Sequence, residues 1–235
     1  MKNNKITTYL LYAIGEIILV VVGILIAVSI DDWNEGIKEN EKQLKIYNDI
    51  LIDLEKDQQH FNGLLEVFKE HNLNYYDIYD AIKIGKQVVN EKAYDWMLYN
   101  RTFAPVTKQN HQSSIDKLKN NTIRTSLNEY FTIQEGARIA INEFNDIIRS
   151  QTRPYFLSEN LFNDEAIFQE DKYAFLPKGT ITNKMLIAEA LKQPKMLQAL
   201  VFLRISTGYS IAALKRLVNA NNDLILMLEK EIDKQ

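Results

Sequence analysis

Residues 9–30 read YLLYAIGEIILVVVGILIAVSI, with one charged side chain, Glu16, among apolar or small residues. A helix of about 20 such residues, rising ~1.5 Å per residue, is long enough to cross the hydrocarbon core of a bilayer. Tyr9, Tyr12 and Trp33 stand where interfacial aromatic side chains are expected. We therefore predict a transmembrane helix over this stretch, with the lipid bilayer as its first partner.

Two other interpretations of this stretch remain open at the level of sequence. Ala27-Val28-Ser29 resembles the small-residue site at which a signal peptide is cleaved, and a soluble protein can also bury an apolar helix. The segment before the uninterrupted apolar run is long for a signal peptide and includes Glu16. We therefore favour an anchor that stays on the mature chain.

The charges beside the apolar stretch predict its orientation. Lys2 and Lys5 precede it, whereas Asp31 and Asp32 follow it. Because basic residues are retained on the cytoplasmic side, we expect a cytoplasmic N-terminus and an exported C-terminal part. The predicted division is a tail over residues 1–8, a transmembrane helix over 9–30, a juxtamembrane linker or helix continuation over 31–39, and an exported helical domain over 40–235.

One face of the predicted span carries a candidate interaction site. Glu16, Gly23 and Ala27 share this face, because intervals of seven and eleven residues are close to whole helical turns. Gly23 and Ala27 form a pair of small residues four apart, which lets another helix approach closely. The alternative is that Glu16 lies near the cytoplasmic interface and reaches water among the headgroups.

Apolar residues after the span recur at alternating intervals of three and four, which predicts long amphipathic helices. Gly and Pro are sparse, at 8 and 4 residues, and no segment shows the period-two alternation of a strand. We therefore predict an all-α fold, with one N-terminal transmembrane helix followed by an antiparallel helical bundle. Long helices are expected over residues 44–82, 122–153 and 195–234, shorter helices over 88–98, 113–118 and 182–192, and irregular segments over 102–112 and 155–179.

Composition excludes several kinds of site. The chain has no cysteine, which excludes disulfides, iron–sulfur clusters and thiol catalysis, and its net charge of −3 argues against a nucleic-acid partner. Asp53, Asp57 and His60 share a helix face, but a di-iron bundle needs a second such set, so we interpret this face as solvated. No nucleophile elbow, phosphate loop or zinc-protease motif occurs, and we predict no metal, no cofactor and no enzymatic activity.

An aromatic-rich region offers a candidate ligand pocket in the exported domain. Tyr75, Tyr79 and Trp96 could line such a pocket, although aromatic residues at helical spacing more often form core contacts. Arg204 interrupts an apolar stripe further along the chain. It would either pair with an acid across the bundle or project outward at the edge of the stripe.

The string AIGEIILVVVGILIAVSIDDWNE at residues 13–35 resembles the N-terminal motif of a family of single-pass membrane proteins of unknown function from Bacteroidota. That motif reads Gly-Glu-Ile, an apolar run, and then Asn-Asn-Trp-Asn-Glu. Gly15-Glu16-Ile17 and Trp33-Asn34-Glu35 match it, Asp31-Asp32 replaces the Asn pair, and residues 103–130 are similar more loosely. The resemblance implies a bacterial inner-membrane protein with a cytoplasmic N-terminus and a helical periplasmic domain, and it implies no activity.

The sequence thus favours an interaction protein of the cell envelope over an enzyme. The leading hypothesis is a membrane-anchored scaffold whose helical domain binds another envelope protein or associates with itself. The first alternative is a periplasmic ligand-sensing bundle that acts through a membrane partner. The second is an ion-coupled accessory subunit that uses Glu16, by analogy with subunits that carry one acid in a single span.

Overall fold

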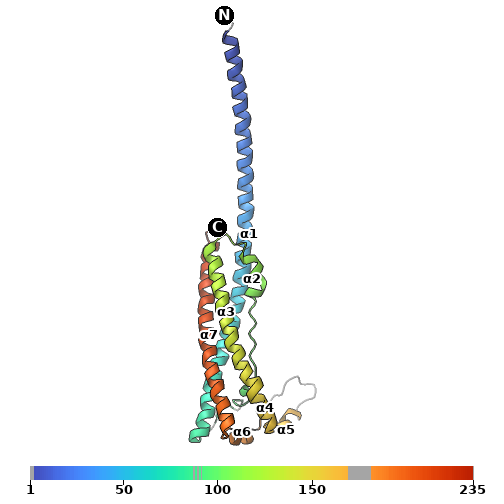
Figure 1. The fold of residues 1–235 in the computed structure, drawn as a ribbon, viewed down its shortest axis with the longest axis vertical. Helices are drawn as coiled ribbons and strands as arrows, with labels where there is room; N and C mark the ends of the chain where they lie inside the picture. The colour runs from blue at the N-terminus through green and yellow to red at the C-terminus, as the bar shows by residue number, and fades with distance from the viewer. Residues whose placement is uncertain (1–2, 87, 89, 91, 169–180, 235) are drawn as a thin grey trace.

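Three long helices dominate the computed structural model, which describes residues 3–86, 88, 90, 92–168 and 181–234. They are α1 (Asn3–Ile84), α3 (Asn121–Ile147) and α7 (Pro194–Ile232). Figure 1 shows the first half of α1 projecting alone from a bundle that its second half forms with the other two helices. The described residues form no β-strand, only an isolated bridge between Phe162 and Thr182. The predicted all-α fold with a long apolar N-terminal helix is confirmed.

Helix α1 runs without interruption through 82 residues, which corresponds to a length of about 120 Å. Residues 31–39 are helical, so this segment continues the helix rather than forming an irregular linker. Every side chain from residue 9 to residue 38 is exposed, and burial begins at Gln43. We call residues 31–42, between the apolar stretch and the bundle, the stalk.

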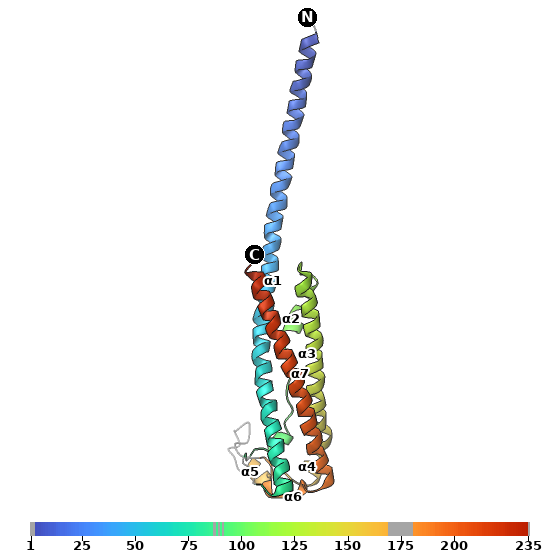
Figure 2. The same ribbon diagram turned by 90° about the vertical axis from the view of Figure 1, so that its left-hand side faces the viewer.

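The three long helices do not simply alternate in direction. Figures 1 and 2 show that α1 and α3 both run away from the projecting end, whereas α7 returns toward it and packs along both. Two parallel helices in the same bundle need a connection that travels back along its length. Residues 99–106 and the short helix α2 (Thr107–Ile115) make that return. We call residues 99–106 the strap.

Two hydrophobic cores follow one another along the bundle. The stalk-end core contains Tyr47, Ile50, Leu54 and Phe61 of α1, Ile123, Leu127 and Tyr130 of α3, and Leu217, Leu224 and Leu228 of α7. The far-end core contains Phe68, Tyr75 and Ile78 of α1, Ile141, Phe144 and Ile148, and Leu200 and Leu203 of α7. Phe103 of the strap packs against both cores and stacks on Phe61, with ring centroids 5.6 Å apart. Each fully buried Leu or Phe contributes roughly 1.5–3 kcal/mol, so packing of these stripes stabilises the bundle.

The end of the α3 region differs from the prediction. We predicted that the helix stops at Arg153-Pro154, but it passes through a π-helical turn, η2 (Ile148–Thr152), into α4 (Arg153–Ser158). Pro154 lies in the first turn of α4, directly after the π turn. The hydroxyl of Thr152 donates to the carbonyl oxygen of Met97 at 2.7 Å, which ties the π turn to the segment before the strap.

Several short elements also lie elsewhere than predicted. The helix expected over 88–98 is reduced to one 3₁₀ turn, η1 (Asp95–Met97), among the described residues. Residues 102–106 are irregular as predicted, but α2 begins at Thr107 within the predicted loop and ends at Ile115, before the predicted end at residue 118. Helix α6 (Lys184–Ala190) begins later than the helix predicted over 182–192, and Asn183 caps it. Thr182 lies outside the helix and donates its hydroxyl to the Asp95 carboxylate at 2.5 Å. Helix α5 (Asp164–Phe168) lies within the segment predicted to be irregular, and the turn expected at Pro177 and Gly179 lies outside the described residues.

Candidate functional site

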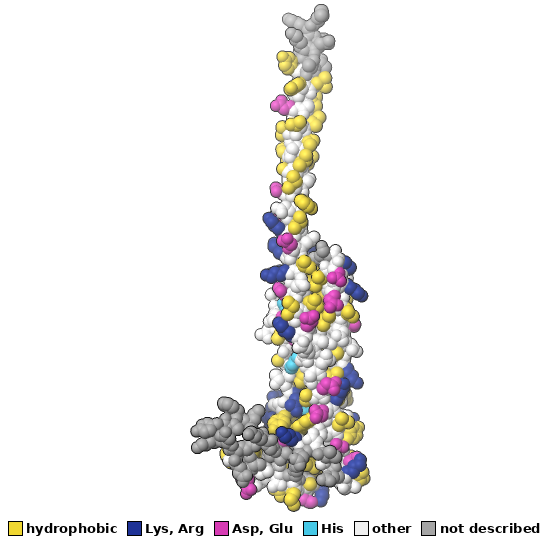
Figure 3. Space-filling model, turned by 180° about the vertical axis from the view of Figure 1, so that it is seen from behind, with side chains coloured by type: hydrophobic (Ala, Val, Ile, Leu, Met, Phe, Trp, Pro, Cys, Tyr) yellow, Lys and Arg dark blue, Asp and Glu magenta, His cyan; other side chains and the backbone are white. Residues whose placement is uncertain are grey.

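The face of the projecting half of α1 seen in Figure 3 is mostly apolar, and the large apolar side chains from Tyr9 to Ile30 are exposed. Among the described residues, α1 and α7 are the helices long and apolar enough to cross a membrane. The apolar stripe of α7 packs inside the bundle, whereas none of the apolar window of α1 is buried. Soluble monomers rarely expose a contiguous apolar surface of this size. The chain therefore carries an N-terminal apolar helix that could span a membrane.

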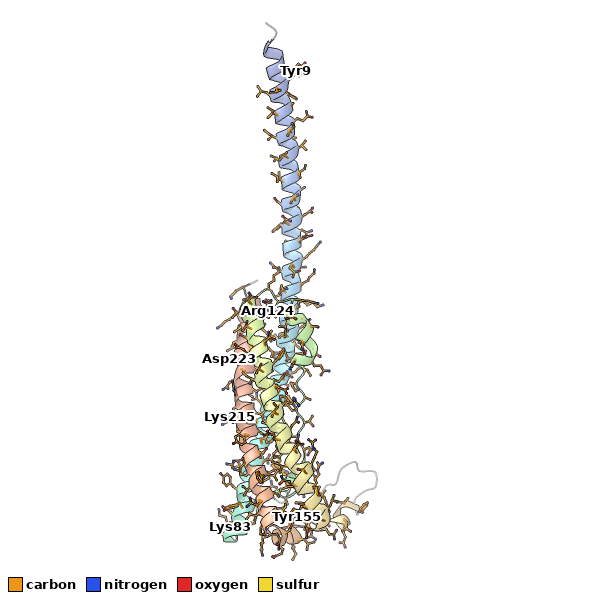
Figure 4. The ribbon with its side chains drawn as sticks, in the orientation of Figure 1. Tyr9, Lys83, Arg124, Tyr155, Lys215 and Asp223 are labelled. Atoms are coloured by element: carbon orange, nitrogen blue, oxygen red, sulfur yellow. The ribbon has the colours of Figure 1, made fainter. Side chains whose placement is uncertain are left out.

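The predicted interaction face of Glu16, Gly23 and Ala27 lies entirely in this projecting half. All three side chains are exposed, and nothing lies within 4 Å of a Cβ placed on Gly23. Figure 4 shows that the side chains of the projecting half of α1, from the labelled Tyr9 toward the bundle, point away from the helix axis into open space. The single chain therefore leaves this face available, and its partner stays a prediction.

Inside the bundle, side chains of α1 and α3 bind the backbone of the strap. Asn145 of α3 bonds both polar groups of Arg101: its Oδ1 accepts from the backbone N–H at 2.7 Å, and its Nδ2 donates to the carbonyl at 2.8 Å. His60 of α1 accepts the backbone N–H of Ala104 through Nε2 at 3.2 Å. The strap is half-buried or exposed along its length, and these side chains supply hydrogen bonds that its irregular backbone does not make within itself.

Asp57 of α1 caps α2 from across the bundle. Its carboxylate accepts the backbone N–H groups of Val106 at 2.7 Å and of Thr107 at 3.1 Å, and the residue is only 2% exposed. A negative charge at a helix N-terminus is stabilised by unpaired N–H groups and by the helix dipole. Asp57 thus supplies the capping oxygen that the sequence around Val106 does not contain.

Two further α1 side chains bind the connection beyond the start of α2. Asp53 accepts from Asn110 Nδ2 at 2.7 Å and pairs with His111 Nε2 at 2.9 Å. Burial alone would raise the pKa of Asp53, but hydrogen bonds from Asn110, Lys56 and His111 outweigh it and lower the pKa to about 2. Gln43 donates to the carbonyl of residue 117 at 2.9 Å and accepts the N–H of residue 119 at 3.0 Å.

The interpretation of Asp53, Asp57 and His60 as a solvated face is therefore wrong. Both carboxylates are buried, and all three side chains bind the strap or α2. Within the described part of the chain, no group of three or more His, Asp or Glu side chains is placed to hold a metal ion. These residues hold the connection in place.

A second buried polar cluster surrounds His71, which is 0% exposed. Its Nε2 accepts from Arg101 Nε at 3.0 Å, so the proton of the neutral ring lies on Nδ1, which faces the Tyr75 hydroxyl at 3.1 Å. Burial, aided by the positive charge of Arg101, lowers the pKa of His71 to about 3. A histidine held neutral to that degree acts here as a hydrogen-bond acceptor for arginine and not as an acid near neutral pH.

The three aromatic residues predicted to line a pocket divide between two places. Tyr75 is buried beside His71, and Trp96 lies against the same imidazole with ring centroids 4.9 Å apart. Tyr79 is exposed one turn further along α1, where the ammonium of Lys83 lies 6.0 Å from its ring centroid. Tyr75 and Trp96 therefore both contact the His71 imidazole, whereas Tyr79 lies apart from them.

Arg204 follows neither of the two alternatives predicted for it. Its guanidinium lies over the ring of Tyr76 of α1, 4.8 Å from the centroid, and Nη2 donates to the Tyr76 hydroxyl at 2.9 Å. The cation thus joins α7 to α1 through an aromatic side chain, an arrangement that contributes about 0.5–2 kcal/mol.

A cavity of about 400 Å³ lies at the end of the bundle farthest from the stalk. Ser150 and Gln151 of the π turn, Tyr155 of α4 and Lys195 in the first turn of α7 contribute polar groups to its wall. The ammonium of Lys195 lies 5.7 Å from the Tyr155 ring centroid, and no carboxylate of the described residues pairs with it. Tyr155 is 8% exposed, yet its hydroxyl has no hydrogen-bond partner within the described structure. The wall therefore presents a cation and a free hydroxyl beside an apolar floor.

Sequence reasoning missed Arg101, Asn145 and Lys195. A polar residue next to Phe144 on a buried stripe was an available signal for Asn145, because an amide there must bind a backbone or side-chain partner. Arg101 lies in a segment predicted to be irregular, and Lys195 is the first residue of a predicted helix. Their roles depend on neighbours that only the fold brings near.

Comparison with known proteins finds a family match over part of the chain. Residues 16–90 match a family of unknown function (DUF6090). The matched range covers most of the apolar stretch, the stalk and the part of α1 that enters the bundle. No curated protein and no solved structure matches the chain. The match thus supports an uncharacterised domain of unknown function in this part of the chain.

Proposed function

We propose that this protein is a non-enzymatic, membrane-anchored scaffold of the bacterial cell envelope. Its apolar stretch crosses the inner membrane once, the N-terminus lies in the cytoplasm, and the bundle stands in the periplasm, where it binds another envelope protein or a second copy of itself. The observation that carries the proposal is the unbroken α1, which joins an exposed apolar helix to the hydrophobic core of a folded bundle.

The polar interior supports a scaffold over an enzyme. The buried carboxylates Asp53 and Asp57 and the buried His71 all have hydrogen-bond partners that position the strap or α2. Catalytic groups are instead expected at a concave surface with a pKa suited to proton transfer. A His71 pKa of about 3 does not suit that task near neutral pH.

Membrane fractionation tests the anchor. The full chain should remain in the membrane pellet after alkaline carbonate extraction. Replacing Val21 and Leu25 with lysine should release it, because each charge at mid-span costs roughly 2.5–3.5 kcal/mol. Matched lysine substitutions at exposed Gln59 and Asn62 of the bundle should leave the chain in the pellet. An intact wild-type chain in the soluble fraction, or a mature N-terminus beyond Ser29, would refute the anchor.

Thiol labelling tests the orientation, because the chain has no native cysteine. A single cysteine at exposed Ser158 should react with a membrane-impermeant maleimide in intact cells that keep their inner membrane. A single cysteine at Lys5 should react only after the inner membrane is broken. The reverse pattern would place the bundle in the cytoplasm and overturn the proposal.

Affinity purification tests the scaffold role. Crosslinking in living cells, followed by purification of the tagged full chain, should recover a second copy or another envelope protein. A chain recovered only as an isolated monomer, across several detergents and crosslinker lengths, would contradict the role.

The cavity beside the π turn favours ligand sensing as a second candidate function. A small molecule with an apolar body and an anionic group would fit the Lys195 ammonium, the free Tyr155 hydroxyl and the apolar floor at Met196 and Ala199. Hexanoate is a suitable probe. It should slow hydrogen exchange of residues 150–158 in the wild type and in a Lys192→Gln control, but not in Lys195→Gln. Equal exchange with and without hexanoate in the wild type would remove this candidate.

A further inference from the structure

The apolar surface of α1 continues beyond the predicted span along one line of the helix. Gly23, Ile30 and Ile37 recur every seven residues, and Ile26 and Trp33 flank them at the fourth position of each interval. The single chain covers none of these residues: Trp33 is 70% exposed and Ile37 is 40% exposed. We call these five residues the stalk stripe.

Lipid does not cover the outer end of the stalk stripe. Ile37 lies seven residues past the end of the apolar stretch at Ile30, which is about 10 Å along the helix axis. A hydrocarbon core of about 30 Å is already filled by residues 9–30, so Ile37 stands among headgroups or in water. Within the described chain, the first buried side chain of α1 is Gln43, so the bundle does not cover Ile37 either.

The charges of the stalk avoid the stripe. They occupy the second, third and sixth positions of both seven-residue intervals that begin at Ile30 and Ile37, which places them on the opposite side of the helix. Glu41, at the edge of the stripe, is the single exception within the stalk. The charged residues on the opposite side are Asp31, Asp32, Glu35, Lys38, Glu39 and Lys42.

The stalk gains little stability from its own chain. It contains Gly36, Asn34 and Asn40, which are weak helix formers. The span and the bundle continue the helix at both ends, but the side chains of residues 31–38 are all exposed. A second helix along the stalk stripe would supply the missing packing.

We propose that two copies of the chain pair in parallel through the stalk stripe. This inference rests on the proposed anchoring, because two copies inserted with the same orientation present identical stripes side by side. A two-fold pair places Ile30 against Ile30 and Ile37 against Ile37, with the charged residues of both stalks turned outward. Gly23 has no side chain, so it lets the two spans approach closely. Nothing of the single chain lies within 4 Å of a Cβ added at this position, so the chain itself does not cover it.

The face of α1 that carries the stripe packs on the chain's own bundle beyond the stalk. Leu44, on the same line, is half-buried, and Tyr47 is buried in the stalk-end core. The paired region therefore ends where each bundle begins, and the two α1 helices must diverge from that point.

Cysteine crosslinking of the full chain in native membranes tests the pair. Under mild oxidation, a single cysteine at Ile37 should form on the order of tenfold more disulfide-linked dimer than a cysteine at Glu35 or Glu39, which lie on the opposite side. Equal dimer at all three positions, or no dimer at Ile37, would overturn the proposal.

A second variant separates the contact from folding of the single chain. Gly23→Leu meets nothing within the chain, so it should leave expression and membrane insertion unchanged while reducing the Ile37 crosslink several-fold. Val21→Leu on the opposite side should leave the crosslink unchanged. A Gly23→Leu chain that crosslinks like the wild type would show that the spans do not approach at Gly23.

The outcomes separate this inference from the proposed function. If Ile37 gives no disulfide but affinity purification recovers a different envelope protein, the pair is wrong and the scaffold stands. If the chain proves soluble, both fail together.

Discussion

Replacing Asp57 with alanine should release α2 and the strap without disturbing the three long helices. The Asp57 carboxylate accepts the N–H groups of Val106 and Thr107 at 2.7 and 3.1 Å, and the described structure offers neither group another partner. Thr107 is fully buried, so water does not take over the lost bond. The alanine variant therefore leaves a buried helix N-terminus uncapped.

The expected loss follows from these two bonds. A hydrogen bond to a charged group contributes about 1.5–3 kcal/mol, and loss of an N-cap costs about 0.5–2 kcal/mol. Because capping and hydrogen bonding describe the same two contacts, they are not summed. We expect a local loss of about 3 kcal/mol, which is roughly a hundredfold in the opening equilibrium of this segment.

Hydrogen exchange of the full chain in detergent measures this loss. Amides of residues 107–115 should exchange roughly a hundredfold faster in Asp57→Ala, while amides in the middle of α3 and α7 change little. Asp49→Ala is the matched control, because Asp49 is an exposed aspartate on the same helix. An exchange rate for α2 within about threefold of the wild type would refute the assignment of Asp57 as its cap.

Further predictions concern pH and the glycines of the long helices. The pKa of His71 is about 3 in the folded chain against an ordinary value of 6.5. The contribution of the neutral ring to the free energy of unfolding is therefore fully present above pH 6.5, and it falls by about 1.4 kcal/mol per pH unit as the pH drops toward 3. His71→Gln should flatten this slope in urea titrations at several pH values, and an unchanged slope would contradict the buried neutral ring. Gly63→Ala should raise the free energy of unfolding by about 1 kcal/mol, because this exposed position in α1 has open space for a methyl group. Gly208→Ala should gain less than Gly63→Ala in the same titration, because the new methyl meets Arg204 Nη1 at 3.2 Å, and an equal gain would show that the guanidinium moves freely.

The long helices could be predicted because their signals are local. Apolar residues at intervals of three and four mark the buried stripes of α1, α3 and α7, and packing of those stripes decides the structure. Neither Gly63 in α1 nor the polar residues 219–223 in α7 break their helices. Gly63 faces open space, and Asn221 donates to the Leu54 carbonyl at 2.9 Å, so it contributes to the contact between α7 and α1.

The strap and α2 could not be predicted because their partners are distant in sequence. Residues 44 to 50 positions earlier bind Ala104, Val106 and Thr107, and Asn145 binds Arg101 from 44 positions later. A helix cap supplied by its own N-cap residue leaves a sequence signature, but a cap supplied by another helix leaves none. Asp53 and Asp57 were interpreted as a solvated face for the same reason, because their hydrogen-bond partners are also distant in sequence.

The candidate aromatic pocket failed to assemble for a geometric reason. Tyr75 and Tyr79 are four residues apart, so helical spacing places them on one face. The bundle covers that face at Tyr75 but not at Tyr79, near the end of α1 at Ile84. The spacing therefore predicted that the two side chains point the same way. It did not predict that the rest of the bundle buries Tyr75 and leaves Tyr79 exposed.

The direction of the helices explains why so many polar side chains are buried in the bundle. Because α1 and α3 run the same way, the chain must return along the bundle between them, and an extended segment does so with few residues, at about 3.3 Å each against 1.5 Å in a helix. An extended segment has no internal hydrogen bonds, so Asn145, Asp57 and His60 supply them. The buried polar residues are thus a consequence of topology. Recognition is therefore expected on the surfaces that topology leaves open, which are the span, the stalk stripe and the far-end cavity.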